Sequence, residues 1–379
     1  MTPEGIPDRV RRTRPPPSLR VQSQAEPEGK PPASVVHLVN RVPTTDPAPA
    51  ASRRAFAPDA LKAFAIFGVV YIHCRSLAGE SPPIEILGEM FRISVPLFII
   101  IWAYFQERAY LAGAAPRSII PSRFTTLVVP FLAWGFLYFL LTADWSTLTL
   151  RNAVTRHWLG SGWSGQYFFI ILFQLILVFP LLRRLPAGAL SLGLTFGLFA
   201  VAFAAADLFS WPSWIAKLSY RPFVYWLPYV VLGVHLARSP DRLVPRGAAI
   251  LGALLIVAEA GLLWPAAGFD SGYAKPGVLI GAGLVTAAFL NREPGPGRVS
   301  DALRPVIELI GRNTMGIFLV NPLVSVVAAP VVARRLDWHG FADPAGSLAL
   351  SLVIATAVLG LCLAATVTLK RLGLRQLVA

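Results

Sequence analysis

Residues 59–75 read DALKAFAIFGVVYIHCR, an apolar run that carries ionisable side chains at both ends. Lys62 and His73 are 11 residues apart, which places them three turns apart and within about 20° of each other on an α-helix. Asp59 precedes Lys62 by one turn, on nearly the same side. Ionisable side chains at membrane depth usually face a protein interior or a watery cavity. The stretch therefore predicts a membrane helix that presents a carboxylate, an ammonium and an imidazole on one face.

Apolar runs of similar length recur through the rest of the chain, separated by short loops that carry proline, glycine and charge. About 20 apolar residues are needed for a helix to cross the hydrocarbon core of a bilayer. The pattern predicts an all-α, polytopic integral membrane protein with about ten transmembrane helices. The expected spans are residues 59–77, 90–106, 124–142, 165–182, 189–209, 218–237, 247–265, 276–291, 306–330 and 347–369.

The composition supports a membrane protein and argues against several other classes. Of the 379 residues, 55% are hydrophobic and 14% are charged, which is too few charges to coat a soluble globule of this size. The net charge of +14 comes largely from basic residues that flank apolar spans, so no nucleic-acid partner is expected. The two cysteines, Cys74 and Cys362, exclude a disulfide framework and a cysteine-rich zinc site. Neither a metal site nor a bound cofactor is expected.

Residues 1–54 differ from the rest of the chain, because they hold 11 of the 33 prolines and show no apolar periodicity. Such a segment buries too little apolar surface to offset the entropy of ordering it. We therefore expect a disordered, basic, proline-rich cytoplasmic arm, followed by one membrane domain over residues 55–379. Placing both termini in the cytoplasm puts 24 basic residues on the inner side and 9 on the outer side. That bias agrees with the positive-inside rule.

Several motifs occur in a recognisable order. Asp59 and Lys62 are followed by His73 within one span, the next span carries Ser-Val-Pro-Leu-Phe-Ile at residues 94–99, and a late segment runs from Ile-Gly to Asn-Pro over residues 310–322. In these features the chain resembles the acyltransferase-3 family of bacterial membrane acyltransferases. Further matching segments lie at residues 123–130, 163–180 and 225–233, and the resemblance covers about residues 55–372.

Three positions depart from the usual pattern of that family. Lys62 replaces an arginine, so a planar bidentate grip on a phosphate or carboxylate becomes a point charge. Trp102 and Ala103 stand where the family usually has Ser-Gly, and Asn321 stands where a late histidine is common. Asparagine cannot act as a base at a position where a histidine could. With these departures, the chain resembles a divergent member of the family.

The resemblance implies an O-acyltransferase that moves an acetyl or similar group from cytoplasmic acyl-CoA, its co-substrate, to a hydroxyl of a cell-envelope glycan or glycolipid. It also implies that His73 is the general base, a role that suits imidazole near neutral pH. Asp59 and Lys62 would position the acyl-CoA end or tune the local field, with Lys62 attracting the CoA phosphates. Arg123 is a second candidate for the CoA phosphates, although an interfacial anchor is its simpler explanation. The expected location is the bacterial cytoplasmic (inner) membrane, with the lipid bilayer as a further partner.

The remaining candidate residues are substrate contacts, most of them expected near the outer face. Arg92 opens the second span, where it could contact the acceptor or developing charge. Aromatic side chains at the start of the fourth span could stack on a sugar face, although aromatic belts are common there. An amide in a late span could add a polar contact. These candidates are Arg92, Ser94, Trp163, Gln166, Tyr167 and Asn321.

A simpler explanation and two other functions compete with this hypothesis. Lys62 could extend to the inner surface and pair with Asp59 without any catalytic role. A multi-span transporter or flippase also fits buried ionisable residues, although the sequence has no evident inverted repeat or pair of broken helices. A Gly-x-Ser-Gly match at residues 162–165 suggests an intramembrane serine protease. Its Ser164 and His235, however, are expected near opposite sides of the membrane.

Overall fold

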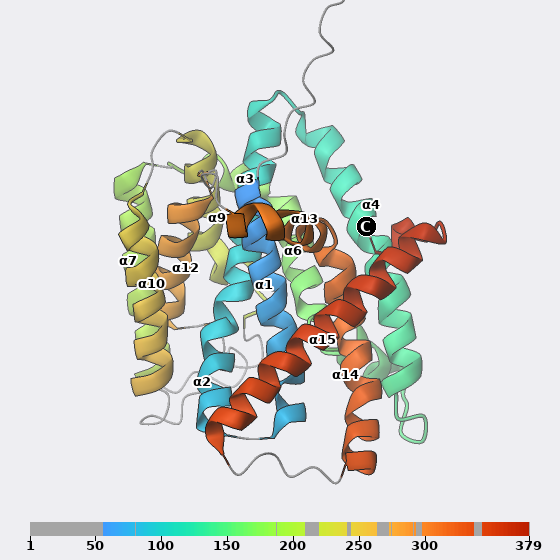
Figure 1. Ribbon diagram of the computed structural model, residues 1–379. Coiled ribbons are helices and arrows are strands. Elements are labelled where there is room, and N and C mark those ends of the chain that lie inside the picture. Colours follow the sequence, from blue (N-terminus) through green and yellow to red (C-terminus); the bar gives the residue numbers. More distant parts are fainter. Residues whose placement is uncertain are drawn as a thin grey trace, which may run out of the picture. The chain divides into compact units, whose positions relative to one another are not determined.

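The computed structural model describes residues 56–378, apart from 80, 187, 209–219, 241–243, 264–272, 274, 291, 293–297 and 337–342. The arm expected at residues 1–54 lies outside the described residues. The described part is helical and contains no strand, which confirms the all-α prediction. The helices (Figure 1) are α1 (Phe56–Cys74), α2 (Pro82–Met90), α3 (Ser94–Leu111), α4 (Pro116–Thr142), α5 (Leu150–Asn152), α6 (Gln166–Leu182), α7 (Ala189–Leu208), α9 (Leu227–Arg238), α10 (Arg246–Ala258), α12 (Pro276–Phe289), α13 (Arg298–Arg312), α14 (Thr314–Leu336) and α15 (Pro344–Arg371).

Proline begins several of these helices. Pro82, Pro116, Pro276 and Pro344 stand in the first turn of α2, α4, α12 and α15. Proline suits that position because the N–H that it lacks has no partner within the helix. At α15 the side chain of Asp343 also accepts a hydrogen bond from the backbone N–H of Gly346 at 2.7 Å, so this helix is capped as well.

Three of the described helices are long and apolar enough to cross a membrane: α1 with the turn that follows it, α4 and α15. α13 and α14 meet at a bend of 75°, and together they would make a fourth span. The expected ten spans are not confirmed, because other apolar helices, such as α6 and α12, have only 10–17 residues. A helix of 17 residues extends about 26 Å, which is less than the roughly 30 Å of a hydrocarbon core.

The bend between α13 and α14 corrects one expected span. The sequence predicts a continuous span over residues 306–330, whereas α13 ends at Arg312 and α14 begins at Thr314. The side-chain amide of Asn313 donates to the carbonyl oxygen of Leu309 at 2.7 Å. Such local bonds from asparagine compete with helix continuation. The span expected at residues 90–106 is also divided, since α2 ends and α3 begins within it.

α1 is packed against α3, α13, α14 and α15, and Figure 1 shows α15 crossing obliquely in front of it. Its neighbours come close to its backbone. A Cβ atom on Gly311 of α13 would lie 2.6 Å from the carbonyl oxygen of Asp59. Ile66 and Val70, in the middle of α1, are fully buried. Because protein surrounds much of α1, its ionisable side chains can face an interior cavity.

α3 and α9 pack closely around Gly233, and this contact gives a prediction about stability. A Cβ atom on Gly233 would lie 2.5 Å from the carbonyl oxygen of Ile100 and 2.7 Å from the Cβ of Ala103. We expect Gly233→Ala to lower the free energy of unfolding by about 1–3 kcal/mol, because the two backbones must move apart. Unfolding in mixed detergent micelles, followed by circular dichroism, measures the change.

Gly197→Ala in α7 is the matched control for Gly233→Ala. Nothing lies within 4 Å of a Cβ atom added there, so the free energy of unfolding should stay the same or rise by up to about 1 kcal/mol. An equal loss of stability in both variants would contradict the close packing of α3 on α9.

Candidate functional site

α1 reaches two cavities, one near each of its ends. His73 lines a cavity of about 550 Å³, which we call the His73 cavity. Asp59 and Lys62 line another of about 530 Å³, which we call the Lys62 cavity. The three residues predicted from the sequence of α1 therefore do not share a cavity. Eleven residues correspond to about 16 Å along a helix, which is why one helix serves both cavities.

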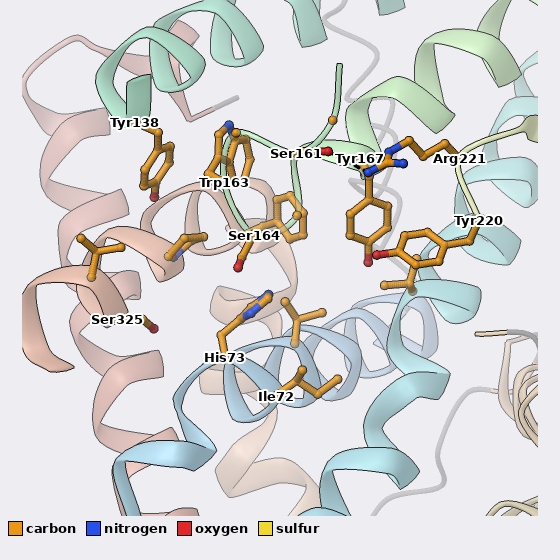
Figure 2. A pocket seen from close by; sticks show the side chains of 18 of the residues that line it. Ile72, His73, Tyr138, Ser161, Trp163, Ser164, Tyr167, Tyr220, Arg221 and Ser325 are labelled. Atoms are coloured by element: carbon orange, nitrogen blue, oxygen red, sulfur yellow. Dashed lines mark hydrogen bonds between the residues drawn. The ribbon is translucent and has the colours of Figure 1, made fainter. Parts of the chain in front are cut away.

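A loop after α5 covers part of the His73 cavity. Residues 160–165 line it, and Figure 2 shows Ser161, Trp163 and Ser164 on this loop. The imidazole of His73 points toward the loop from α1, and the side chain of Ser164 extends toward that imidazole (Figure 2). The cavity volume lies within the range of about 300–1,000 Å³ that is usual for small-molecule sites.

Gln166 holds this loop in place. Its side-chain oxygen accepts a hydrogen bond from the N–H of Gly162, and its side-chain nitrogen donates to the carbonyl oxygen of His157, both at 2.7 Å. Gly165, which directly precedes α6, has a φ of 97°, a conformation that glycine adopts without strain. Gln166 is fully buried and lines neither cavity. Its position is that of a loop support, whereas the sequence predicts a substrate contact.

Trp163 and Tyr167, two of the predicted substrate contacts, line the His73 cavity. The Trp163 ring stacks on Tyr138, with ring centroids 5.0 Å apart and an interplanar angle of 24°. Trp163 is only 7% exposed, so packing already uses most of its surface. The hydroxyl of Tyr167 lies 2.6 Å from the hydroxyl of Tyr273. The role of both residues in binding a sugar stays a prediction.

Arg92 and Ser94, both predicted substrate contacts, occupy different environments. Arg92 lines the His73 cavity and lies over the ring of Tyr273, 5.5 Å from its centroid. It also lies 3.5 Å from the carboxylate of Glu89, which makes a shorter contact of 2.6 Å to Lys275. Ser94 is fully buried, lines neither cavity, and its hydroxyl has no hydrogen-bond partner among the described residues.

The Lys62 cavity brings together the residues predicted to bind the donor. The ammonium of Lys62 lies 2.6 Å from the carboxylate of Asp59, which is the pairing that the simpler, non-catalytic explanation of Lys62 expects. Arg123 of α4 lines the same cavity. Lys62, Arg123 and the carboxylate of Asp59 together give these side chains a net charge of +1 beside apolar walls, which suits a ligand with both phosphate and apolar parts. Those walls include Phe98, Ile101, Trp102, Phe105, Leu127, Phe168, Leu172, Ile176 and Met315.

Aromatic rings lie between the two cavities. Phe98 and Phe168 line the Lys62 cavity, and Phe318 lines the His73 cavity. The ring of Phe168 contacts both others, at 6.2 Å from Phe98 and 5.5 Å from Phe318. A ligand that spans both cavities must therefore pass these rings.

Asn321 lies one turn after Phe318 on α14. It is fully buried and lines neither cavity. Neither atom of its side-chain amide has a hydrogen-bond partner within the described part of the chain. An unpaired amide in an apolar interior is costly, but its position does not bring it to either cavity wall.

The His73 cavity contains residues that the sequence did not single out. Arg221, Tyr220 and Tyr273 line it, and a terminal nitrogen of Arg221 donates to the Ser161 hydroxyl at 2.7 Å. In the sequence, Arg221 is one of many basic residues that flank apolar spans, so its charge alone does not indicate a binding site. The tyrosines lie in segments distant from α1, so local periodicity carries no signal for them.

The pair of Ser164 and His235, considered for an intramembrane serine protease, is not present in the described geometry. Ser164 lines the His73 cavity, whereas His235 lines neither cavity, so the two do not form a dyad. Across the described residues, no three His, Cys, Asp or Glu side chains come close enough to hold a metal ion together.

Comparison with known proteins gives the family. A model described as an acyltransferase domain, that of the acyltransferase-3 family, matches residues 56–369. The matched segment contains all of the described residues that line either cavity. No curated protein and no solved structure gives a significant match. With its long apolar helices, this chain belongs to the acyltransferase-3 family and is a membrane acyltransferase.

Proposed function

We propose that the chain is an O-acyltransferase of the bacterial cytoplasmic membrane that transfers an acetyl or similar group from cytoplasmic acyl-CoA to a hydroxyl of a cell-envelope glycan or glycolipid. The observation that carries the proposal is the placement of the two ends of α1. His73 lines one cavity, and Lys62 lines the other together with Arg123. Acyl transfer from CoA needs a base for the hydroxyl and a binding site for the phosphorylated donor.

In the proposed reaction, His73 takes the proton from the acceptor hydroxyl while the hydroxyl oxygen attacks the thioester carbonyl carbon. A C–O bond forms and the C–S bond to CoA breaks. The imidazolium then returns its proton to the departing thiolate, so the products are an ester and free CoA. Asp59 and Lys62 act as positioning residues in this scheme, because they line the other cavity.

The proposed topology places the Lys62 cavity on the cytoplasmic side. The excess of basic residues on the inner side supports this orientation, with both termini in the cytoplasm. Acyl-CoA would bind its phosphates at Lys62 and Arg123, and its acyl end would reach His73 past Phe168 and Phe318. The acceptor would enter the His73 cavity from the outer side.

A transporter is the second candidate, and one observation favours it. The bend of 75° between α13 and α14 makes a broken helix, a feature of many transporters. Family membership and the histidine-lined cavity favour acyl transfer. Covalent labelling of the acceptor distinguishes the two functions, because transport leaves the acceptor unmodified.

Removal of the Lys62 charge tests where the donor binds. We expect Lys62→Gln to raise the KM for acyl-CoA by about 10-fold, because a charge-assisted hydrogen bond contributes about 1.5–3 kcal/mol. Lys62→Arg keeps the charge and should keep most of the affinity. Release of the CoA thiol by membrane vesicles, measured over a range of acyl-CoA concentrations, gives the KM.

Lys370→Gln is the matched control, because this lysine of α15 lines neither cavity. Its KM for acyl-CoA should equal that of the wild type. A KM that is unchanged in Lys62→Gln, in protein that inserts normally, would contradict the placement of the donor in the Lys62 cavity.

A further inference from the structure

We infer that the acceptor carries an anionic group, a carboxylate or a phosphate, that binds between Arg92 and Arg221 in the His73 cavity. The inference rests on the proposed function for the identity of the ligand as an acyl acceptor. Binding of the anion itself does not depend on acyl transfer, so the two can be tested separately.

The His73 cavity is cationic. Arg92 and Arg221 line it, and none of the described residues that line it is Asp or Glu. The carboxylate of Glu89 lies 3.5 Å from Arg92 but 2.6 Å from Lys275. One negative charge therefore serves two cations, and the three side chains keep a net charge of +1. A net charge in a largely buried site is unfavourable without a counter-charge, which an anionic ligand would supply.

Arg92 is suited to bind that ligand directly. Its side chain is only 20% exposed, and its guanidinium lies over the ring of Tyr273. The ring limits the positions that the guanidinium can take. A planar guanidinium with five N–H donors fits a carboxylate or a phosphate better than a lysine does.

Arg221 stands on the loop side of the cavity, beside the hydroxyl of Ser161. It donates to the Ser161 hydroxyl at 2.7 Å, and Figure 2 shows its guanidinium at the backbone end of Tyr167, with the hydroxyls of Tyr167 and Tyr220 farther away. A Cβ atom on Gly160 would lie 3.2 Å from the Cα of Tyr167 and 3.4 Å from the Nε of Arg221, which agrees with that view. Tyrosine offers an apolar ring and a hydroxyl. Cations next to tyrosines suit a sugar that bears an acidic group.

The shared cavity connects this anion site to the acceptor. Arg92, Arg221 and His73 line one cavity, whereas Lys62 and Arg123, the proposed contacts of the CoA phosphates, line the other. A ligand held by the two arginines is therefore the one whose hydroxyl can reach the imidazole. The acceptor class is an acidic sugar or a phosphorylated glycan.

Direct binding tests the anion site. The full chain in lipid nanodiscs is titrated with glucuronate, glucose 6-phosphate and glucose, and tryptophan fluorescence reports binding. At least one anionic sugar should bind about 10-fold more tightly than glucose, as expected for a charge-assisted pair of hydrogen bonds. The tighter of the two identifies carboxylate or phosphate as the preferred group.

Arg221→Gln should reduce the affinity for that anionic sugar to the level of glucose, while Arg221→Lys should keep part of the preference. Arg151→Gln is the matched control, because Arg151 is an exposed arginine that lines neither cavity. It should bind like the wild type. Equal affinity for all three sugars, or unchanged affinity in a folded Arg221→Gln variant, overturns the inference.

Acyl transfer separates this inference from the proposed function. In Arg221→Gln the KM for an acidic acceptor should rise about 10-fold while the KM for acyl-CoA stays constant. If the KM for acyl-CoA rises instead, the arginines bind the donor and the inference is overturned. If the wild type consumes no acyl-CoA but still binds an anionic sugar through Arg221, the proposed function fails and the anion site stands.

Discussion

His73→Gln is expected to lower acyl transfer to the glycan by about 10²–10⁴-fold, which is the usual contribution of a general base. Glutamine keeps a polar side chain of similar length but cannot accept a proton at neutral pH. The side chain of His73 lines a cavity, so its replacement should not disturb the packed core. Initial rates of label transfer from radiolabelled acyl-CoA to envelope glycan, in vesicles with equal amounts of protein, measure the change.

His235→Gln is the control for this experiment. His235 lies on α9 and lines neither cavity, so this variant should keep the wild-type rate. A His73→Gln variant that is inserted normally and still transfers the acyl group at the wild-type rate would show that His73 is not the base.

Glu107→Gln is expected to lower the free energy of unfolding by about 2–3 kcal/mol. Glu107 of α3 is fully buried, and its two carboxylate oxygens lie 2.9 Å from Arg183 and 2.9 Å from Arg238. These arginines follow α6 and end α9, so one carboxylate joins three helices. Breaking a buried pair costs about 3–5 kcal/mol. The smaller value expected here reflects the 29% and 32% exposure of the two arginines, which keeps them partly hydrated.

Glu308→Gln provides the comparison for Glu107. Glu308 of α13 also contacts two arginines, Arg304 at 2.9 Å and Arg312 at 2.7 Å, but these pairs lie on one helix and are more exposed. Its removal should cost less than about 1 kcal/mol. Detergent unfolding of both variants tests the contrast. Equal losses would mean that burial between helices does not strengthen the Glu107 contacts.

The chemistry of α1 could be predicted from sequence because it depends on local helix geometry. The three-residue spacing of Asp59 and Lys62 puts both on nearly the same side of the helix, and in the structure the two form an ion pair, as the simpler, non-catalytic explanation of Lys62 also expects. The spacing of His73 from Lys62 sets a distance along the same helix. This spacing does not show which other helices enclose each end of α1. The sequence therefore could not show whether Lys62 and His73 line one cavity or two.

Long-range contacts and helix breaks explain the rest of the difference. Arg221 and Tyr273 reach the His73 cavity only through tertiary packing, which no periodic pattern reports. Gln166 lies between Trp163 and Tyr167 in the sequence, which predicts a ligand contact. In the structure its side chain makes two hydrogen bonds to backbone groups and so holds the loop in place. Residues 306–330 are predicted as one span because hydropathy does not register a bend, although the part that belongs to α13 carries charged side chains.

The measurement that tests the central claim most directly uses acyl-CoA labelled with ¹⁴C in the acyl group and ³H in the CoA part. It is supplied on the cytoplasmic side of vesicles that contain the acceptor glycan. We predict that ¹⁴C appears on the glycan without ³H, that one CoA thiol is released for each acyl group transferred, and that His73→Gln abolishes both. Movement of glycan across the membrane with no ¹⁴C attached to it would contradict acyl transfer and would identify a transporter.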